Sequence, residues 1–320
     1  LASMGRVQTP TCGFLVEREL EREKFEPVAY YSAKVNCQGV TFSVIFHDKN
    51  DSDVWKDGDG KINLERTFNA DLAKNVVAAL KTHGELNIID VKEGRYSRNP
   101  KPAFETQTLI KTAGVTLGWS SGKVMATASE LYNAGHTTYM RTDSTRTSPS
   151  ARDAVRSYIS QEWGDEYLGK GVVGKAGQNV QDAHEAIRPT SPEVRAPSGL
   201  SKDQSRLYQL IWARFAASQM TKSDYERRTL SCKVESVPQQ LKGTLSWCVH
   251  LGWEVAFADV SGLPRTTEPD FDYSPGSKLV VDEEEENPKL IDDATKPPAR
   301  YKEHTLIEEM KSHGIGRPST

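Results

Sequence analysis

Hydrophobic residues between positions 103 and 222 recur with the 3.6-residue period of an amphipathic helix. The clearest stripes run over 124–132, 151–159 and 207–218. A stripe of this kind packs one face of a helix into a core, which is its ordinary meaning in a globular protein. We therefore expect residues 99–222 to form a mostly helical domain.

Strand-like runs of apolar and β-branched residues lie on both sides of this helical region. They cover 43–46, 87–91, 228–234, 243–249 and 253–257. The order along the chain is therefore β, then helical, then β. We expect 27–98 and 223–288 to form one β domain, whose chain leaves to build the helical domain and then returns.

Helical patterns outside the central region complete this plan. They cover 12–25, where Pro27 stops the helix, 69–83 within the first β segment, and about 303–313. The sequence opens inside one motif and ends on another, at Thr320. We therefore expect it to be an excised part of a longer protein.

The composition is that of a globular protein, with 37% hydrophobic and 27% charged residues. No apolar run reaches the about 18 residues of a membrane-spanning helix, so no membrane partner is expected. The four cysteines form no CxxC pair, which argues against structural zinc and favours a reducing compartment. A Cys232–Cys248 disulfide across a hairpin is the less favoured alternative.

The net charge of −3 hides an uneven distribution. Residues 98–223 contain 16 Lys and Arg against 11 Asp and Glu, whereas the rest of the chain contains 25 against 33. A basic middle within an acidic frame permits a confined phosphate-binding surface. The bias is mild, so it does not establish one.

The strongest candidate for chemistry is the segment 137–144, Thr-Thr-Tyr-Met-Arg-Thr-Asp-Ser. If it is extended, Tyr139, Arg141 and Asp143 lie on one face. A fixed guanidinium can stabilise both a phenolate and the charge that builds on a phosphate, so this pair suits phosphoryl transfer. On spacing alone, a half-buried tyrosine beside an ion pair is the more ordinary explanation.

A second cluster lies at 182–189, Asp-Ala-His-Glu-Ala-Ile-Arg-Pro. On a helix, His184 and Arg188 would share a face, where one could move a proton and the other could hold a phosphate. Arg188 stands where the second histidine of a zinc-protease HExxH motif would be, so that class is excluded. A structural histidine at a helix end is the alternative.

Two further clusters lie near the chain ends, at 5–10 and 314–320. Each places an arginine, Arg6 or Arg317, among turn-forming and small polar residues that suit phosphate. Neither is specific when taken alone.

Together and in this order, the four clusters resemble the type IA DNA topoisomerases, and most closely the bacterial topoisomerase I branch. The resemblance implies an α+β multidomain protein with a toroidal core. Residues 27–98 and 223–288 would form a β-rich arch interrupted by the mostly helical domain, 99–222, which bears the catalytic tyrosine. Residues 1–26 and 289–320 would belong to a helical base domain.

The resemblance also implies an activity and site residues. Tyr139 would cleave one DNA strand through a 5′-phosphotyrosine intermediate and rejoin it without ATP, which relaxes negative supercoils. Arg141 and His184 would assist at the catalytic site. The implied DNA contacts are Arg6, Gln8, Asp143, Ser144, Arg188, Arg317 and Thr320.

In this family, Mg²⁺ is held by a domain that would precede Leu1, so we expect no metal ligands in this chain and no relaxation by the chain alone. The implied partner is single-stranded or underwound DNA, bound by a monomer in the bacterial cytoplasm, at the nucleoid. A non-catalytic clamp for single-stranded DNA is the main alternative. A relaxase would need a histidine-rich metal cluster, and a tyrosine recombinase several arginines around a late tyrosine; neither pattern is present.

Overall fold

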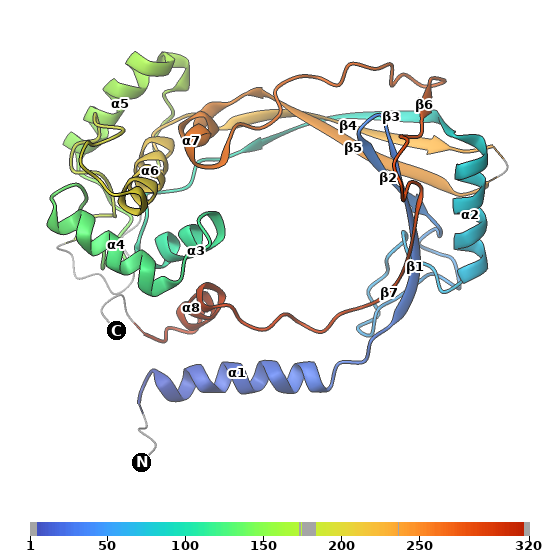
Figure 1. The fold of residues 1–320 in the computed structure, drawn as a ribbon, viewed down its shortest axis with the longest axis horizontal. Helices are drawn as coiled ribbons and strands as arrows, with labels where there is room; N and C mark the ends of the chain where they lie inside the picture. The colour runs from blue at the N-terminus through green and yellow to red at the C-terminus, as the bar shows by residue number, and fades with distance from the viewer. Residues whose placement is uncertain (1–4, 173, 175–183, 236, 317–320) are drawn as a thin grey trace.

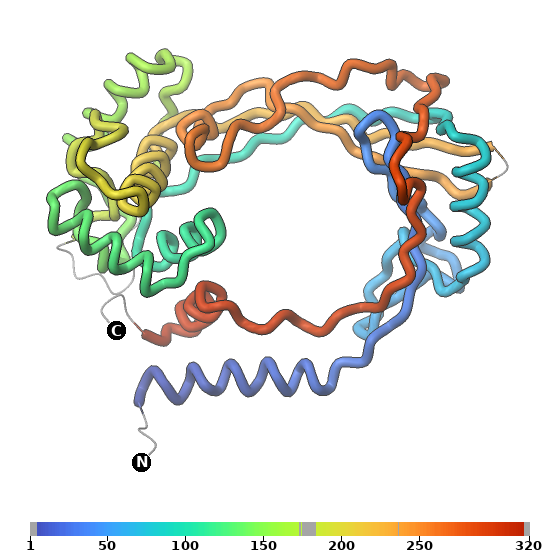
Figure 2. Tube along the Cα trace, viewed as in Figure 1, coloured from blue at the N-terminus to red at the C-terminus, as the bar shows by residue number. Residues whose placement is uncertain are grey.

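The protein is described by a computed structural model that covers residues 5–172, 174, 184–235 and 237–316. Its helices and strands are arranged around a ring (Figures 1 and 2). Long strands and the helix α2 (Ala70–His83) form one side of the ring, and a group of helices forms the opposite side. The helices α1 (Gln8–Glu23) and α8 (Glu303–Ser312) close it along the base.

Seven strands form one antiparallel sheet in the order β6-β3-β4-β5-β2-β1-β7. Their bounds are β1 Ala29–Cys37, β2 Val40–Ile45, β3 Glu85–Arg98, β4 Ser223–Lys233, β5 Gln240–His250, β6 Lys278–Val280 and β7 Lys289–Ala294. β3 pairs with β4, and β2 pairs with β5. Strands that precede the helical region are thus hydrogen-bonded to strands that follow it.

The packing of the sheet core accounts for the alternation of buried and exposed residues along its strands. Buried and exposed positions alternate along β2 and β5, and α2 covers the buried face with Ala73, Val76 and Leu80. A Cβ atom at Gly243 would lie 2.6 Å from the ring of Phe42, so only glycine allows these strands to approach. α2 matches the predicted helix, beginning after the Asn69 cap.

The helical side has its own core, separate from that of the sheet. It is built from α3 (Thr106–Thr116), α4 (Ser121–Asn133), α5 (Pro149–Trp163) and α6 (Lys202–Ala217), with a short 3-10 helix, η1 (Asp165–Tyr167). The predicted stripes point inward: Val124, Leu131 and Ile159 are fully buried. Serine caps begin α4, α5 and α6 by accepting a backbone amide.

The strand predicted at 253–257 is wrong. These residues form a 3-10 helix, η2 (Gly252–Phe257), which continues into α7 (Ala258–Ser261). Gly252 has a φ of 48° and lies against the backbone of Lys222, which turns the chain away from the sheet. Ala256 then packs into the helical core. A short apolar run cannot by itself distinguish these outcomes.

All four cysteines are free. In the β4–β5 register, Cys232 lies opposite Leu241 and Cys248 opposite Tyr225, so the alternative hairpin disulfide does not form. Burial raises the pKa of Cys37 and Cys232 to about 12, which keeps both thiols protonated and unreactive. Among the described residues, no helix is both long and apolar enough to span a membrane.

Candidate active site

The tyrosine segment connects α4 to α5. Gly135, with a φ of 77°, ends α4 as the sequence predicts, and the residues that follow form no regular strand. Burial nevertheless alternates: Met140, Thr142 and Ser144 are buried, whereas Tyr139 and Asp143 are half-buried and Arg141 is exposed. This alternation agrees with an extended segment whose Tyr139, Arg141 and Asp143 share one accessible face.

The N-terminus of α3 holds the buried side of this segment. The Thr106 hydroxyl lies 2.7 Å from the carbonyl oxygen of Met140, and it accepts the amide of Thr142 at 2.8 Å. The Thr106 amide donates to the Thr142 carbonyl oxygen at 2.9 Å. Thr106 was not among the predicted site residues, because its role depends on a contact between segments that are far apart along the chain.

The second cluster does not form the predicted helix. Residues 184–189 are extended and bridge two neighbours, through Ile187 to Phe104 and through Pro189 to Thr137. Proline disfavours the helical conformation in the residue before it, and the backbone groups find partners in the tyrosine segment instead. The prediction that His184 and Arg188 share a helix face is therefore wrong.

The extended conformation brings His184 to the tyrosine. The rings of Tyr139 and His184 have centroids 5.3 Å apart and are tilted by 33°. Tyr132, from the last turn of α4, meets Tyr139 edge-on at 5.3 Å. His184 and Tyr132 thus both contact the tyrosine ring, and they orient its hydroxyl by packing. Tyr132 was not predicted as a site residue either.

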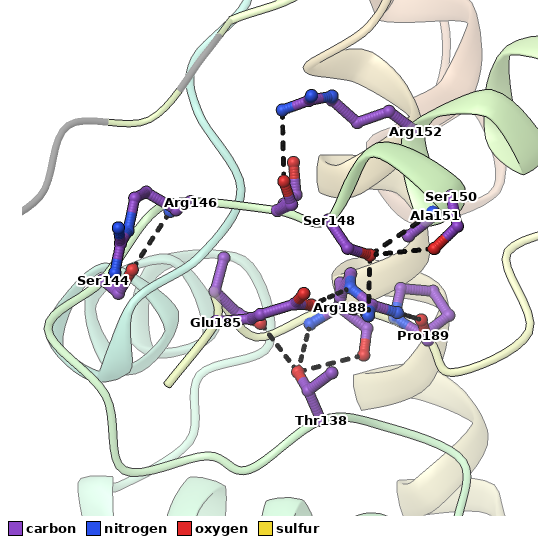
Figure 3. Close-up of polar contacts among 12 residues, drawn as sticks. Thr138, Ser144, Arg146, Ser148, Ser150, Ala151, Arg152, Glu185, Arg188 and Pro189 are labelled. Carbon is purple, nitrogen blue, oxygen red and sulfur yellow. Dashed lines mark hydrogen bonds and ion pairs between the residues drawn. The ribbon is translucent and has the colours of Figure 1, made fainter. Parts of the chain in front are cut away.

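Arg188 is tied to its own surroundings (Figure 3). Its Nε donates to Glu185 at 2.7 Å, and its Nη1 donates to the Pro189 carbonyl oxygen at 2.8 Å. Its Nη2 reaches the hydroxyl of Ser148, which caps α5, at 3.4 Å. A phosphate bound by Arg188 would therefore compete with Glu185.

Thr138 fastens the two segments to each other (Figure 3). Its hydroxyl donates to the Ala186 carbonyl oxygen at 2.7 Å and accepts the Arg188 amide at 3.0 Å. The Thr138 amide donates to the Arg188 carbonyl oxygen at 2.9 Å. Position 138 thus fixes Tyr139 relative to residues 184–189, which we call the histidine segment.

Ser144 shapes the loop from within. It is 1% exposed, and its hydroxyl accepts the Arg146 amide at 3.2 Å (Figure 3). Its hydroxyl therefore does not face the surface in this conformation. The carbonyl oxygen of Arg146, a residue that the sequence patterns did not single out, accepts the Ala186 amide at 2.7 Å.

The ends of the described chain meet the tyrosine segment at a cavity of about 300 Å³. Val7, Arg141, Met310 and Gly316 are among its lining residues. Arg6 is exposed in the turn before α1, and Gln8 is the first residue of that helix. Arg317 and Thr320 lie outside the described residues. All four predicted clusters nevertheless have described members around Tyr139 or this cavity.

Polar contacts join α3 and the first residue of α4 to α8. Lys111 pairs with Glu308 at 2.6 Å, and Lys311 pairs with Glu105. The hydroxyl and amide of Ser121 donate to Glu303 and hold the pKa of that carboxyl below its ordinary value. We call these three contacts the junction.

The described residues near Tyr139 do not make up a divalent-cation site. The described carboxylates of residues 137–144 and 184–189 are Asp143 and Glu185, and Glu185 is engaged by Arg188. In the described part of the chain, the one group of three metal-type side chains is His47, Asp51 and Asp53. It lies between β2 and α2, on the other side of the ring from α4 and α5.

A family model described as DNA topoisomerase matches residues 1–320, which is the whole chain. The chain belongs to this family, in its type IA, bacterial topoisomerase I branch. The predicted fold class, a mixed α and β protein with a toroidal core, is confirmed by the ring and by its likeness to a solved topoisomerase I.

DNA topoisomerase 1 of Thermotoga maritima is 35% identical over 99% of this chain and 48% of its own length. The Haemophilus influenzae protein of the same name is also 35% identical, over 99% of this chain and 35% of its own length. The structure of full-length topoisomerase I from Thermotoga maritima matches all of this chain and 50% of that one, with a TM-score of 0.76 and 32% identity. The chain thus spans between about a third and a half of these relatives.

Proposed function

We propose that this chain supplies the DNA-cleaving tyrosine of an enzyme that relaxes negative supercoils without ATP. Tyr139 Oη loses its proton and forms a bond to the phosphorus of a phosphodiester, while the bond to the 3′-oxygen breaks and that oxygen takes up a proton. The 5′-phosphate stays bound to the tyrosine until the 3′-hydroxyl reverses the attack. The supporting observation is the accessible face shared by Tyr139 and Arg141, with His184 packed against the phenol ring.

Each site residue has a role that follows from the chemistry of its side chain. The Arg141 guanidinium stabilises the negative charge that builds on the phosphate during attack. His184 packs against the phenol ring and positions it, and its imidazole is able to exchange a proton near neutral pH. The expected DNA contacts remain Arg6, Gln8, Asp143, Ser144, Arg188, Arg317 and Thr320. A Mg²⁺ ion would add charge neutralisation, but the residues described around Tyr139 do not fit one, so no step is assigned to it.

The domain plan follows from the same proposal. The sheet segments 27–98 and 223–288 form the arch, except that 252–261 packs with the helical domain. Residues 1–26 and 289–320 form part of the base. The helical domain moves away from the base after cleavage, so that a second strand passes. The intact enzyme acts as a monomer on single-stranded or underwound DNA, in the bacterial cytoplasm at the nucleoid.

The test is covalent capture of DNA by the full-length protein with Mg²⁺. A single-stranded oligonucleotide labelled at its 3′ end should remain attached to the denatured protein, whereas a 5′ label should be released. Tyr139→Phe should abolish the adduct. Tyr132→Phe, which alters the neighbouring phenol, should retain it. An adduct that survives Tyr139→Phe contradicts the proposal.

A non-catalytic clamp for single-stranded DNA is the second candidate, favoured by the exposed cationic side chains of Arg6 and Arg141 near the cavity. It predicts that the full-length protein binds single strands but forms no adduct with either label. Binding that weakens as salt rises is expected of both candidates, so only the adduct separates them.

A further inference from the structure

The segment between β2 and α2, residues 46–69, forms a small lobe on β1 (Figure 1). Tyr31 and Thr67 exchange backbone hydrogen bonds of 2.8 and 2.9 Å. The buried Trp55 ring donates its Nε1–H to the Ala29 carbonyl oxygen at 2.9 Å. A tight turn at 47–54 completes the lobe, where Asp51 accepts the Asp48 amide at 2.8 Å. The turn is therefore built on a well-anchored base.

His47 begins this turn, and its ring is buried. The residue is 6% exposed, and its buried Nε2 has no hydrogen-bond partner among the described residues. Its Nδ1 points at two carboxylates, lying 3.7 Å from Asp51 Oδ2 and 3.5 Å from Asp53 Oδ1. Both separations are longer than an ordinary N–H···O hydrogen bond.

These separations suit ligands that share one cation. Nitrogen and oxygen ligands at about 2.0–2.2 Å from a tetrahedral ion lie about 3.3–3.6 Å from one another. Neighbouring ligands of an octahedral Mg²⁺ would lie only about 2.9 Å apart. The three ligand atoms all lie within 4.8 Å of one another, and the 80%-exposed Asp53 side chain is able to close any remaining gap.

We propose that His47 Nδ1, Asp51 Oδ2 and Asp53 Oδ1 bind a divalent transition-metal ion, with water as the fourth ligand. One imidazole with two carboxylates favours Zn²⁺ or a neighbouring first-row ion over Mg²⁺ or Ca²⁺, which prefer all-oxygen sites. The ion ties the turn to the lobe. It lies across the ring from the helices that carry the tyrosine segment, so its role is structural, outside strand cleavage.

The rival state is a protonated His47 that pairs with both carboxylates and binds no metal. Cobalt(II) distinguishes the two, because a tetrahedral Co²⁺ site absorbs visible light far more strongly than an octahedral one. The experiment uses the chelator-treated 320-residue chain with Cys12→Ser, which removes the exposed thiol. We expect one equivalent of Co²⁺ to bind with intense visible absorption, and Zn²⁺ to displace it.

The deciding variant is Asp53→Asn, because its exposed side chain is not needed for folding. It should weaken Co²⁺ binding at least tenfold, and His47→Gln should abolish it. Asp48→Asn removes the same charge from the same turn and should leave the affinity unchanged. No saturable binding at millimolar Co²⁺, a weak octahedral spectrum, or equal affinity in Asp53→Asn would each overturn the proposal.

Discussion

The sheet side and the tyrosine side of the ring are held together by different forces. On the sheet side, β3 and β4 are paired from Asn87–Lys233 to Arg98–Ser223, and the end that carries Ile88 and Cys232 lies on an apolar core. On the tyrosine side, single hydroxyls of Thr106 and Thr138 fix an irregular segment. The continuous β3–β4 pairing resists separation of the two strands. The threonine hydroxyls position the tyrosine segment with few hydrogen bonds.

The junction differs from both. Its contacts are ion pairs and hydrogen bonds around a cavity of about 300 Å³, and their side chains are at least partly exposed except for the buried Glu105. An exposed ion pair contributes only about 0–1 kcal/mol. The helical core and the sheet core are separate, and Ile307 of α8 packs against the helical core. The opening proposed above would therefore break the junction and the Ile307 contact, and it would leave the sheet core in place.

The largest expected effect lies in the sheet core. Phe42→Ala should lower the free energy of unfolding by about 3–5 kcal/mol, because it leaves a cavity beside Gly243. Phe68→Ala, at an exposed site, should cost less than about 1 kcal/mol. Urea unfolding curves measure both. Equal losses would mean that the sheet core is not the stable part of the ring.

Arg141→Ala should affect chemistry and leave stability alone. Loss of one charge-stabilising donor should slow adduct formation about 10²–10³-fold in the full-length protein, with an unchanged melting temperature. Lys202→Ala, which removes an exposed cation from the same side of the ring, is the control and should leave the rate unchanged. An equal loss of rate in both variants would mean that the overall positive charge of this side, rather than the position of Arg141, speeds adduct formation.

Thr138→Ala should affect both stability and chemistry, since its hydroxyl bonds fix the tyrosine segment to the histidine segment. We expect a loss of about 1–2 kcal/mol in unfolding free energy, and slower adduct formation. Thr138→Ser keeps the hydroxyl and should restore most of both. If serine restores stability without the rate, the methyl group rather than the hydrogen bonds positions Tyr139.

The smallest effect is expected at the junction, and it should depend on pH. The pKa of Glu303 is lowered in the folded protein, so its contact with Ser121 stabilises above the ordinary value of 4.5 and is lost as the pH falls through the folded value. Glu303→Gln should therefore lower stability by at most about 0.5 kcal/mol at pH 7. Below the folded value, the variant and the parent chain should unfold alike in matched thermal scans.

Local sequence patterns were enough to predict the elements whose conformation depends mainly on their own residues. The stripes in α4, α5 and α6 predicted helices because one apolar face per 3.6 residues leaves few alternatives. The turn-forming Gly135 ended α4 as expected, and the α2 pattern located that helix to within a residue. The order and spacing of the four motifs along the chain were also enough to identify the family.

Contacts between distant segments decided the rest. Residues 253–257 have a strand-like composition, but Gly252 turns them onto the helical core. Residues 184–189 have a helical spacing, but their backbone groups bond to the tyrosine segment. The junction contacts of α8 likewise join residues that are far apart along the chain. In each case the free energy came from partners that the chain brings together only on folding, and no local window contains them.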